Sequence, residues 1–211
     1  MVEPLEKVTA FVIRRSATNP ELLLLEHPYA GMQIPAGTVE VDEPLEQAVL
    51  REVAEETGLT DVAIRAYLGA AEESFPPETR FVLRRTHIYA RPDATSFDWA
   101  YLRRGIMVTA IRHAGEFTQI TYTEHDREPD PEYVTMQITG WAPDDALTAV
   151  QQRHFFLLDF TGQTEHEASR EPWQVFSDNH TFTLFWAPLA ALPELIHPQD
   201  QWLTWLKKAI P

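Results

Sequence analysis

Residues 37–59, GTVEVDEPLEQAVLREVAEETGL, constrain this chain more than any other segment, because they end in a helical pattern crowded with acids. At about 100° per residue, Glu52 and Glu56 lie roughly 40° apart on a helix, with Glu55 roughly 60° to one side. Aliphatic residues occupy the neighbouring arc, so one face can be buried. Gly58 can then end the helix in the left-handed conformation. The segment therefore predicts an amphipathic helix that presents three carboxylates beside its buried face.

Such a helix is electrostatically unfavourable on its own. Like charges four residues apart cost about 0.2–0.5 kcal/mol, and acids in the last turn oppose the helix dipole by roughly 0.3–1 kcal/mol each. Arg51 offsets only part of this repulsion. Clustered carboxylate oxygens suit Mg²⁺ or Mn²⁺, which predicts a divalent-cation site. Taken alone, the run REVAEE is equally compatible with a solvated acidic face.

The spacing of the whole segment resembles the Nudix box, GX5EX7REUXEEXGU, in which U is an aliphatic residue. The run QIPA at residues 33–36 also resembles the family's approach to this box. All nine specified positions match at fixed offsets, which makes the resemblance highly specific. They are Gly37, Glu43, Arg51, Glu52, Val53, Glu55, Glu56, Gly58 and Leu59.

The resemblance gives some of these positions structural roles. Gly37 lets the loop turn tightly beside bound phosphate or metal, and Gly58 closes the helix. In family members the first glutamate and the arginine brace the loop against the helix. The resemblance therefore implies that Glu43 and Arg51 are structural.

Other positions carry the chemistry that the resemblance implies. Glu52 and Glu56 correspond to the usual metal ligands of the family, and Glu55 shares that role. The same three glutamates are the catalytic candidates of this chain. The backbone carbonyl of Ala36 is a further candidate ligand, and the implied cofactor is Mg²⁺ or Mn²⁺.

The implied activity is metal-dependent hydrolysis of the diphosphate bond in a nucleoside diphosphate linked to another moiety. The expected substrate is therefore a small-molecule diphosphate, and its leaving group is open. The alternative is a catalytically silent Nudix module that binds a nucleotide or a partner as a regulator. Homodimers are frequent in the family, so a homodimer is one assembly to test. A base outside the box often assists, and four acids in a late polar stretch are equal candidates: Glu165, Glu167, Glu171 and Asp178.

Composition excludes several other classes of function. The 211-residue chain has a formal net charge of −15, which argues against binding a nucleic-acid polymer. It contains no cysteine, so disulfides and thiol catalysis are excluded. The eight histidines are scattered without the spacing of a zinc site, and we interpret them as ordinary surface or core residues. Neither a signal peptide nor a membrane-spanning run is apparent, so we expect a cytoplasmic protein without a membrane partner.

The resemblance implies the α/β class, as an α+β sandwich in which a mixed β-sheet lies between helices. Hydrophobic patterning predicts a hairpin from residues 8–14 and 21–26, and later strands at 62–71, 80–90 and 181–186. Residues 154–160 resemble a further strand of the family. Residues 199–210 have apolar side chains at helical spacing and predict a closing helix. We assign residues 1–101 and 151–211 to the Nudix domain.

Residues 102–150 have no counterpart in this scheme and predict an inserted small antiparallel β unit, because alternating strands and turn signals follow one another. Their order resembles a bacterial SH3-like barrel, and an elongated hairpin that extends the main sheet is the open alternative. We expect this insertion to shape substrate entry or a subunit contact. Four nearby aromatic residues fit either stacking on a base or a place in a core: Trp99, Tyr101, Phe117 and Trp141.

Overall fold

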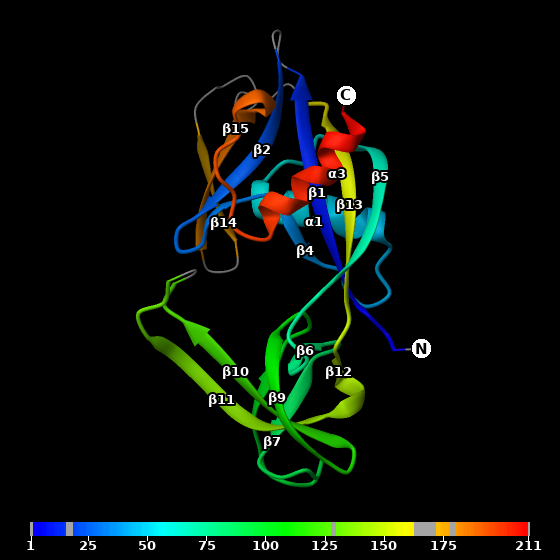
Figure 1. Ribbon diagram of the computed structural model, residues 1–211, viewed down its shortest axis with the longest axis vertical. Coiled ribbons are helices and arrows are strands. Elements are labelled where there is room, and N and C mark those ends of the chain that lie inside the picture. Colours follow the sequence, from blue (N-terminus) through cyan, green and yellow to red (C-terminus); the bar gives the residue numbers. More distant parts are fainter. Residues whose placement is uncertain (1, 16–18, 128–129, 163–171, 178–179, 211) are drawn as a thin grey trace. The chain divides into compact units, whose positions relative to one another are not determined.

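The computed structural model describes residues 2–15, 19–127, 130–162, 172–177 and 180–210, which form an α+β structure (Figure 1). The chain divides into two compact units, each with its own sheet. One unit comprises Val8–Val39, Glu43–Ala70 and His154–Pro211, and we call it the box unit. The other comprises Met1–Lys7, Glu40–Asp42 and Ala71–Arg153, and we call it the β unit.

The box unit is built on an eight-stranded sheet with the order β14-β15-β2-β1-β13-β5, in which β3 pairs with β2 and β4 with β1. Three of its strands, β1, β5 and β13, continue into the β unit. Its elements are β1 (Leu5–Arg15), β2 (Pro20–His27), β3 (Gly31–Gln33), β4 (Ala36–Thr38), α1 (Leu45–Thr57), β5 (Val62–Glu73), β13 (Gln151–Phe160), β14 (Trp173–Ser177), β15 (His180–Pro188), the 3₁₀ turn η2 (Leu189–Ala191) and α3 (Gln199–Ala209).

This sheet contains both strand directions. The expected hairpin is present, since β1 and β2 pair antiparallel with Ile13 opposite Leu22. By contrast, β1 and β13 run the same way: the N–H of Leu5 donates to the carbonyl of Val150, and further along both strands Phe11 stacks on Phe155. The predicted mixed sheet is therefore confirmed.

Each face of the sheet is covered by one helix, because successive side chains of a strand point to opposite faces. On one face, Val8 and Val12 of β1 join a buried core with Val49 and Val53 of α1. On the other, the ring of Phe155 stacks on Trp205 of α3, with centroids 4.9 Å apart. The sheet thus lies between α1 and α3, as predicted. No helix in the described residues is both long and apolar enough to cross a membrane.

The β unit is built on a seven-stranded sheet with the order β12-β6-β9-β10-β11-β7-β8. Strands β9, β10 and β11 form an antiparallel meander, and the turn between the first two contains Gly115 at a φ of +63°. Its elements are β6 (Thr79–Val82), β7 (Thr86–Tyr89), β8 (Asp98–Leu102), β9 (Met107–Ala114), β10 (Phe117–His125), β11 (Val134–Pro143), the 3₁₀ turn η1 (Asp144–Ala146) and β12 (Leu147–Thr148).

The β unit includes more of the chain than the insertion expected at residues 102–150. The strands at 107–143 belong to a sheet separate from the main one, and β6, β7 and β8 join them there. The resemblance of residues 102–150 to an SH3-like barrel stays a prediction. Of the expected stacking residues, Trp141 is buried, whereas the exposed fractions of Trp99 and Tyr101 are 49% and 51%.

The prediction of a single strand at residues 80–90 is wrong. The structure has two strands there, β6 and β7, which lie apart in the sheet because β6 pairs with β9 and β12 while β7 pairs with β8 and β11. Between them, the N–H of Leu83 donates to the carbonyl of Ala146, and the carbonyl of Val82 accepts from Gly105. These tertiary partners break the strand where local patterning predicts continuity.

Candidate active site

The helix α1 ends at Gly58, as the sequence predicts. Pro44 precedes it in an extended conformation, and its carbonyl accepts hydrogen bonds from the N–H groups of Gln47 and Ala48. At the other end Gly58 has a φ of +74°, and its N–H donates to the carbonyl of Ala54. A residue with a Cβ is strained in that conformation, so glycine defines the end of the helix.

Burial of one face fixes how α1 presents its acids. Ala48, Val49 and Val53 are completely buried against the sheet, and burying such a valine contributes about 1.5–3 kcal/mol. Because Glu52 and Glu56 occupy the adjoining arc, this packing directs them toward the segment that contains β4. The sequence thus sets the orientation of the acids through the valines beside them.

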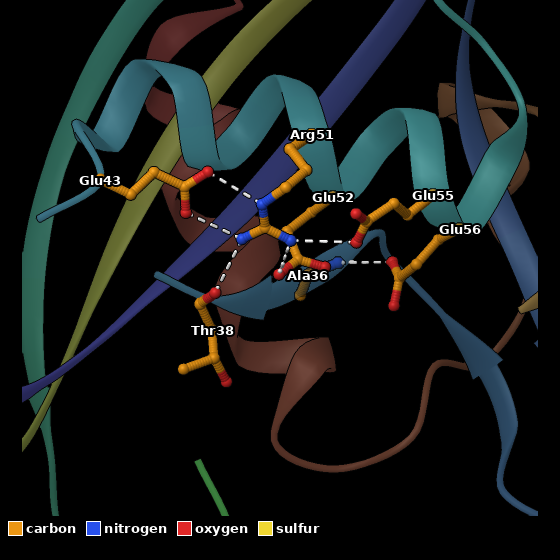
Figure 2. A network of polar contacts seen from close by, with 7 residues as sticks. All are labelled: Ala36, Thr38, Glu43, Arg51, Glu52, Glu55 and Glu56. Atoms are coloured by element: carbon orange, nitrogen blue, oxygen red, sulfur yellow. Dashed lines mark hydrogen bonds and ion pairs between the residues drawn. The ribbon is translucent and has the colours of Figure 1, made fainter. Parts of the chain in front are cut away.

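Arg51 lies at the centre of a polar network that joins α1 to the preceding loop (Figure 2). Its Nε and Nη2 donate to the two oxygens of Glu43 over 2.8 and 2.9 Å, and Nη2 also donates to the carbonyl of Thr38 over 3.0 Å. Its Nη1 donates to Glu52 and to Glu55, each over 3.0 Å. These five contacts match the five N–H donors of a guanidinium. The hydrogen bonds with Glu43, followed by the charge of Glu52, raise the pKa of Arg51 above its usual range.

Two acids of α1 lie against the same short piece of backbone, in β4. The Oε2 of Glu56 accepts a hydrogen bond from the N–H of Ala36 over 3.0 Å (Figure 2). The carboxylate of Glu52 fills the space where a Cβ on Gly37 would lie, and its side chain is only 13% exposed. The dipeptide at 36–37 therefore brings Glu52 and Glu56 together.

Glu55 is placed differently. Its side chain is 55% exposed, and it forms an ion pair with Arg51 one helical turn before it. The structure therefore groups Glu52 and Glu56 at β4 and leaves Glu55 more exposed, where it shares the Nη1 of Arg51 with Glu52.

The fit of this site to a divalent cation depends on its donor chemistry. In the described part of the chain, no three or more His, Cys, Asp or Glu side chains converge as a ready metal cage. Mg²⁺, however, is usually held by one or two carboxylates, with water and substrate phosphates as its other ligands. Glu52 and Glu56 beside the backbone at 36–37 supply oxygen donors of that kind. The residues present fit a cation that binds together with its substrate.

Some parts of the site lie beyond sequence reasoning. The carbonyl of Thr38 accepts from Arg51, but any residue has a backbone carbonyl, so no sequence signal could have identified it. The four acids considered as a base lie outside the described residues: Glu165, Glu167, Glu171 and Asp178.

Comparison with known proteins gives a family match. The model of the NUDIX domain matches residues 5–100. No curated protein sequence matches the chain.

Solved structures similar to this chain include the NUDIX domain of Shewanella oneidensis NrtR in complex with ADP ribose, with 15% identity, coverage of 100% of this chain and 91% of that chain, and a TM-score of 0.48. A second is the Ap4A hydrolase of C. elegans, with 13% identity, coverage of 98% and 96%, and a TM-score of 0.44. A third is the MutT protein of Methanosarcina mazei Go1, with 14% identity, coverage of 100% and 99%, and a TM-score of 0.44.

Proposed function

Because the chain belongs to the Nudix family through the NUDIX domain at residues 5–100, we propose that it is a metal-dependent pyrophosphohydrolase. Its substrate is a nucleoside diphosphate linked to another moiety. Water adds to one phosphorus, the P–O bond of the anhydride breaks, and the second phosphate leaves with the group attached to it. The observation that carries this proposal is the placement of Glu52 and Glu56 against the backbone at 36–37.

The residues of the site have separate roles in this reaction. Glu52 and Glu56 hold Mg²⁺ or Mn²⁺, Glu55 shares this role from its more exposed position, and the Ala36 carbonyl is a further ligand. The cation supplies charge neutralisation at the phosphates and lowers the pKa of water. Arg51 contributes by position, since its contacts with Glu43 and Thr38 fix the loop to the helix before substrate arrives.

The experiment replaces the carboxylate of Glu52 with an amide. Glu52→Gln keeps the size of the side chain but removes its charge, and it should lower Mg²⁺-dependent phosphate release from a panel of diphosphate compounds by at least about 100-fold. Glu46→Gln is the matched control, because Glu46 lies in the first turn of the same helix. Retained metal-dependent turnover in Glu52→Gln, equal to that of the control, would refute the assignment.

Calorimetric titration with Mg²⁺, combined with an assay of phosphate release, distinguishes an enzyme from a catalytically silent module. The enzyme should bind Mg²⁺ and turn over at least one compound of a panel that contains nucleoside triphosphates, dinucleoside polyphosphates and nucleotide sugars. Binding of panel compounds without phosphate release from any of them would instead identify a regulatory module.

A further inference from the structure

The connection between β3 and β4 leads directly into the backbone that contacts Glu52 and Glu56. Because β3 pairs with β2 and β4 pairs with β1, the chain passes from one strand to the other at Ile34 and Pro35. The carbonyl of Pro35 accepts a hydrogen bond from β1. Ile34 is 1% exposed, and a buried backbone N–H requires a partner within the protein.

That partner is the side chain of Gln199, the first residue of α3. The Oε1 of Gln199 accepts a hydrogen bond from the N–H of Ile34 over 2.5 Å, although the two residues are 165 positions apart in the chain. Two residues after Ile34, the N–H of Ala36 binds Glu56. The helix that covers the face opposite α1 therefore contacts the segment on which the acids of α1 rest.

Gln199 is a polar residue on the buried face of its helix. The buried residues of α3 are Gln199, Trp202 and Leu206, which have the spacing of one helical face, and Gln199 is only 6% exposed. An amide buried in this way is unfavourable unless it forms hydrogen bonds. The contact with Ile34 therefore accounts for a glutamine at a position where helical patterning favours an apolar residue.

The chain just before α3 also contacts β3. The N–H of Ile196 donates to the carbonyl of Met32 over 3.0 Å, and the carbonyl of Ile196 accepts from the N–H of Gln199 over 2.8 Å. A Cβ at Gly31 would lie 3.0 Å from Cγ2 of Ile196, so the two segments are in close contact. Gln199 thus acts from a well-fixed position, at the start of a helix that is bonded to β3.

The dipeptide at 36–37 is held on both sides in the sequence. After it, the carbonyl of Thr38 accepts from Arg51 of α1 (Figure 2). Before it, the N–H of Ile34 donates to Gln199 of α3. Two helices on opposite faces of the sheet therefore fix the backbone that meets the acids, and only the contact from α1 belongs to the Nudix box.

We propose that Gln199 is a positioning residue of the hydrolase, which acts through Ile34 to hold the N–H of Ala36 where it binds Glu56. This inference rests on the proposed function and adds to it a requirement from the far end of the chain. Without the Oε1 acceptor, the buried N–H of Ile34 must find another partner, and the backbone that follows shifts with it. Glu56 then loses the fixed donor that orients its carboxylate.

Gln199→Met tests this role, because methionine is unbranched and flexible like glutamine but has no oxygen acceptor. We expect kcat of Mg²⁺-dependent phosphate release to fall about 10- to 100-fold, since a misplacement of about 1 Å in a catalytic group can lower the rate about 100-fold. KM should change much less than kcat, because the lost contact orients an acid and does not touch the substrate. A thermal melt checks that each variant is folded at the assay temperature.

Amide hydrogen exchange gives a readout that needs neither cation nor turnover. Followed by NMR in the metal-free protein, it reports the hydrogen bonds of single residues. In Gln199→Met the amides of Ile34 and Ala36 should exchange at least about 10-fold faster, while that of Gly58 at the end of α1 stays unchanged. A general loss of stability would instead speed exchange at Gly58 as well.

Gln201→Met is the matched control, because Gln201 lies in the same turn of α3 but is exposed. It should equal the wild type in kcat and in amide exchange. Gln199→Glu is the conservative variant, since it keeps an oxygen acceptor within reach of Ile34. It should restore most of the kcat and most of the protection that Gln199→Met loses.

Three results would overturn the proposal: wild-type exchange at Ala36 in Gln199→Met, faster exchange there with wild-type kcat, or an equal loss of kcat in Gln201→Met. Absence of turnover in the wild type would instead reject the hydrolase. Exchange at Ala36 would then still decide whether Gln199 positions the donor to Glu56.

Discussion

The carboxylate of Glu52 occupies the space that a side chain at position 37 would need, and Gly37 leaves that space open. A glycine of β4 and an acid of α1 thus pack directly against each other. The glycine is required here for close approach, because a Cβ at this position would overlap the carboxylate itself.

Gly37→Ala should displace the Glu52 carboxylate without unfolding the protein, since Glu52 lies at the end of a flexible side chain. A misplacement of about 1 Å in a catalytic group can lower the rate about 100-fold, and we expect a loss of that order in kcat. Steady-state kinetics and a thermal melt measure the two effects. Wild-type kcat in the alanine variant would show that the position of Glu52 is not critical.

Arg51→Lys should destabilise the chain by about 1–3 kcal/mol, because lysine cannot reproduce the paired hydrogen bonds to Glu43. Urea unfolding of Arg51→Lys, Glu43→Gln and the double variant forms a cycle. We expect a coupling free energy of about 0.5–3 kcal/mol between the two positions. Strict additivity would mean that the contact contributes nothing to the stability of the fold.

Glu73→Gln should be among the more destabilising polar substitutions in the β unit. Arg153 is almost completely buried, and its Nε donates to Glu73 over 2.9 Å, while Gln151 also donates to Glu73. Burial lowers the pKa of Arg153, and the charge of Glu73 opposes this effect. Breaking a buried pair typically costs about 3–5 kcal/mol.

Guanidinium unfolding measures this cost, with Glu72→Gln as the control, because Glu72 is the exposed neighbour on the same strand. Replacing both partners, as in Glu73→Leu with Arg153→Met, should recover much of the loss. A double variant as unstable as Glu73→Gln would argue that the pair itself stabilises the fold.

The titration of His27 should make the free energy of unfolding increase as the pH rises. Burial, and then the neighbouring His180, lower the pKa of His27 below its ordinary value of 6.5. Between the folded and unfolded pKa values, the unfolded chain binds more protons, so this contribution to stability is present above about pH 6.5 and declines as the pH falls. His27→Gln should reduce the pH dependence of the unfolding free energy below pH 6.5. An NMR titration that places the pKa of His27 above 6.5 would contradict the assignment.

Local patterning predicts the elements of the box unit well because their signals are themselves local. Gly58 ends α1 through its own backbone conformation, and the valines of the helix fix its buried face. The strand at residues 80–90 could not be predicted as two, since its interruption depends on hydrogen bonds from Leu83 and to Val82 that involve distant residues.

The site shows the same limit. Its acids occur in one short motif, whereas the contacts of the His180 ring with His27 and Tyr29 join segments that are far apart in the sequence. Sequence reasoning treats these histidines as ordinary, because only the pairing of β15 with β2 brings them together.

The saturated guanidinium of Arg51 has a consequence for the thermodynamics of cation binding. All five of its N–H groups already have acceptors in the loop and the helix, so the motif is assembled before any ion arrives. A cation that binds Glu52 or Glu55 must therefore compete with Nη1 of Arg51, and little of its binding free energy is consumed in ordering the chain. Its measured affinity should report an exchange of partners rather than a folding step.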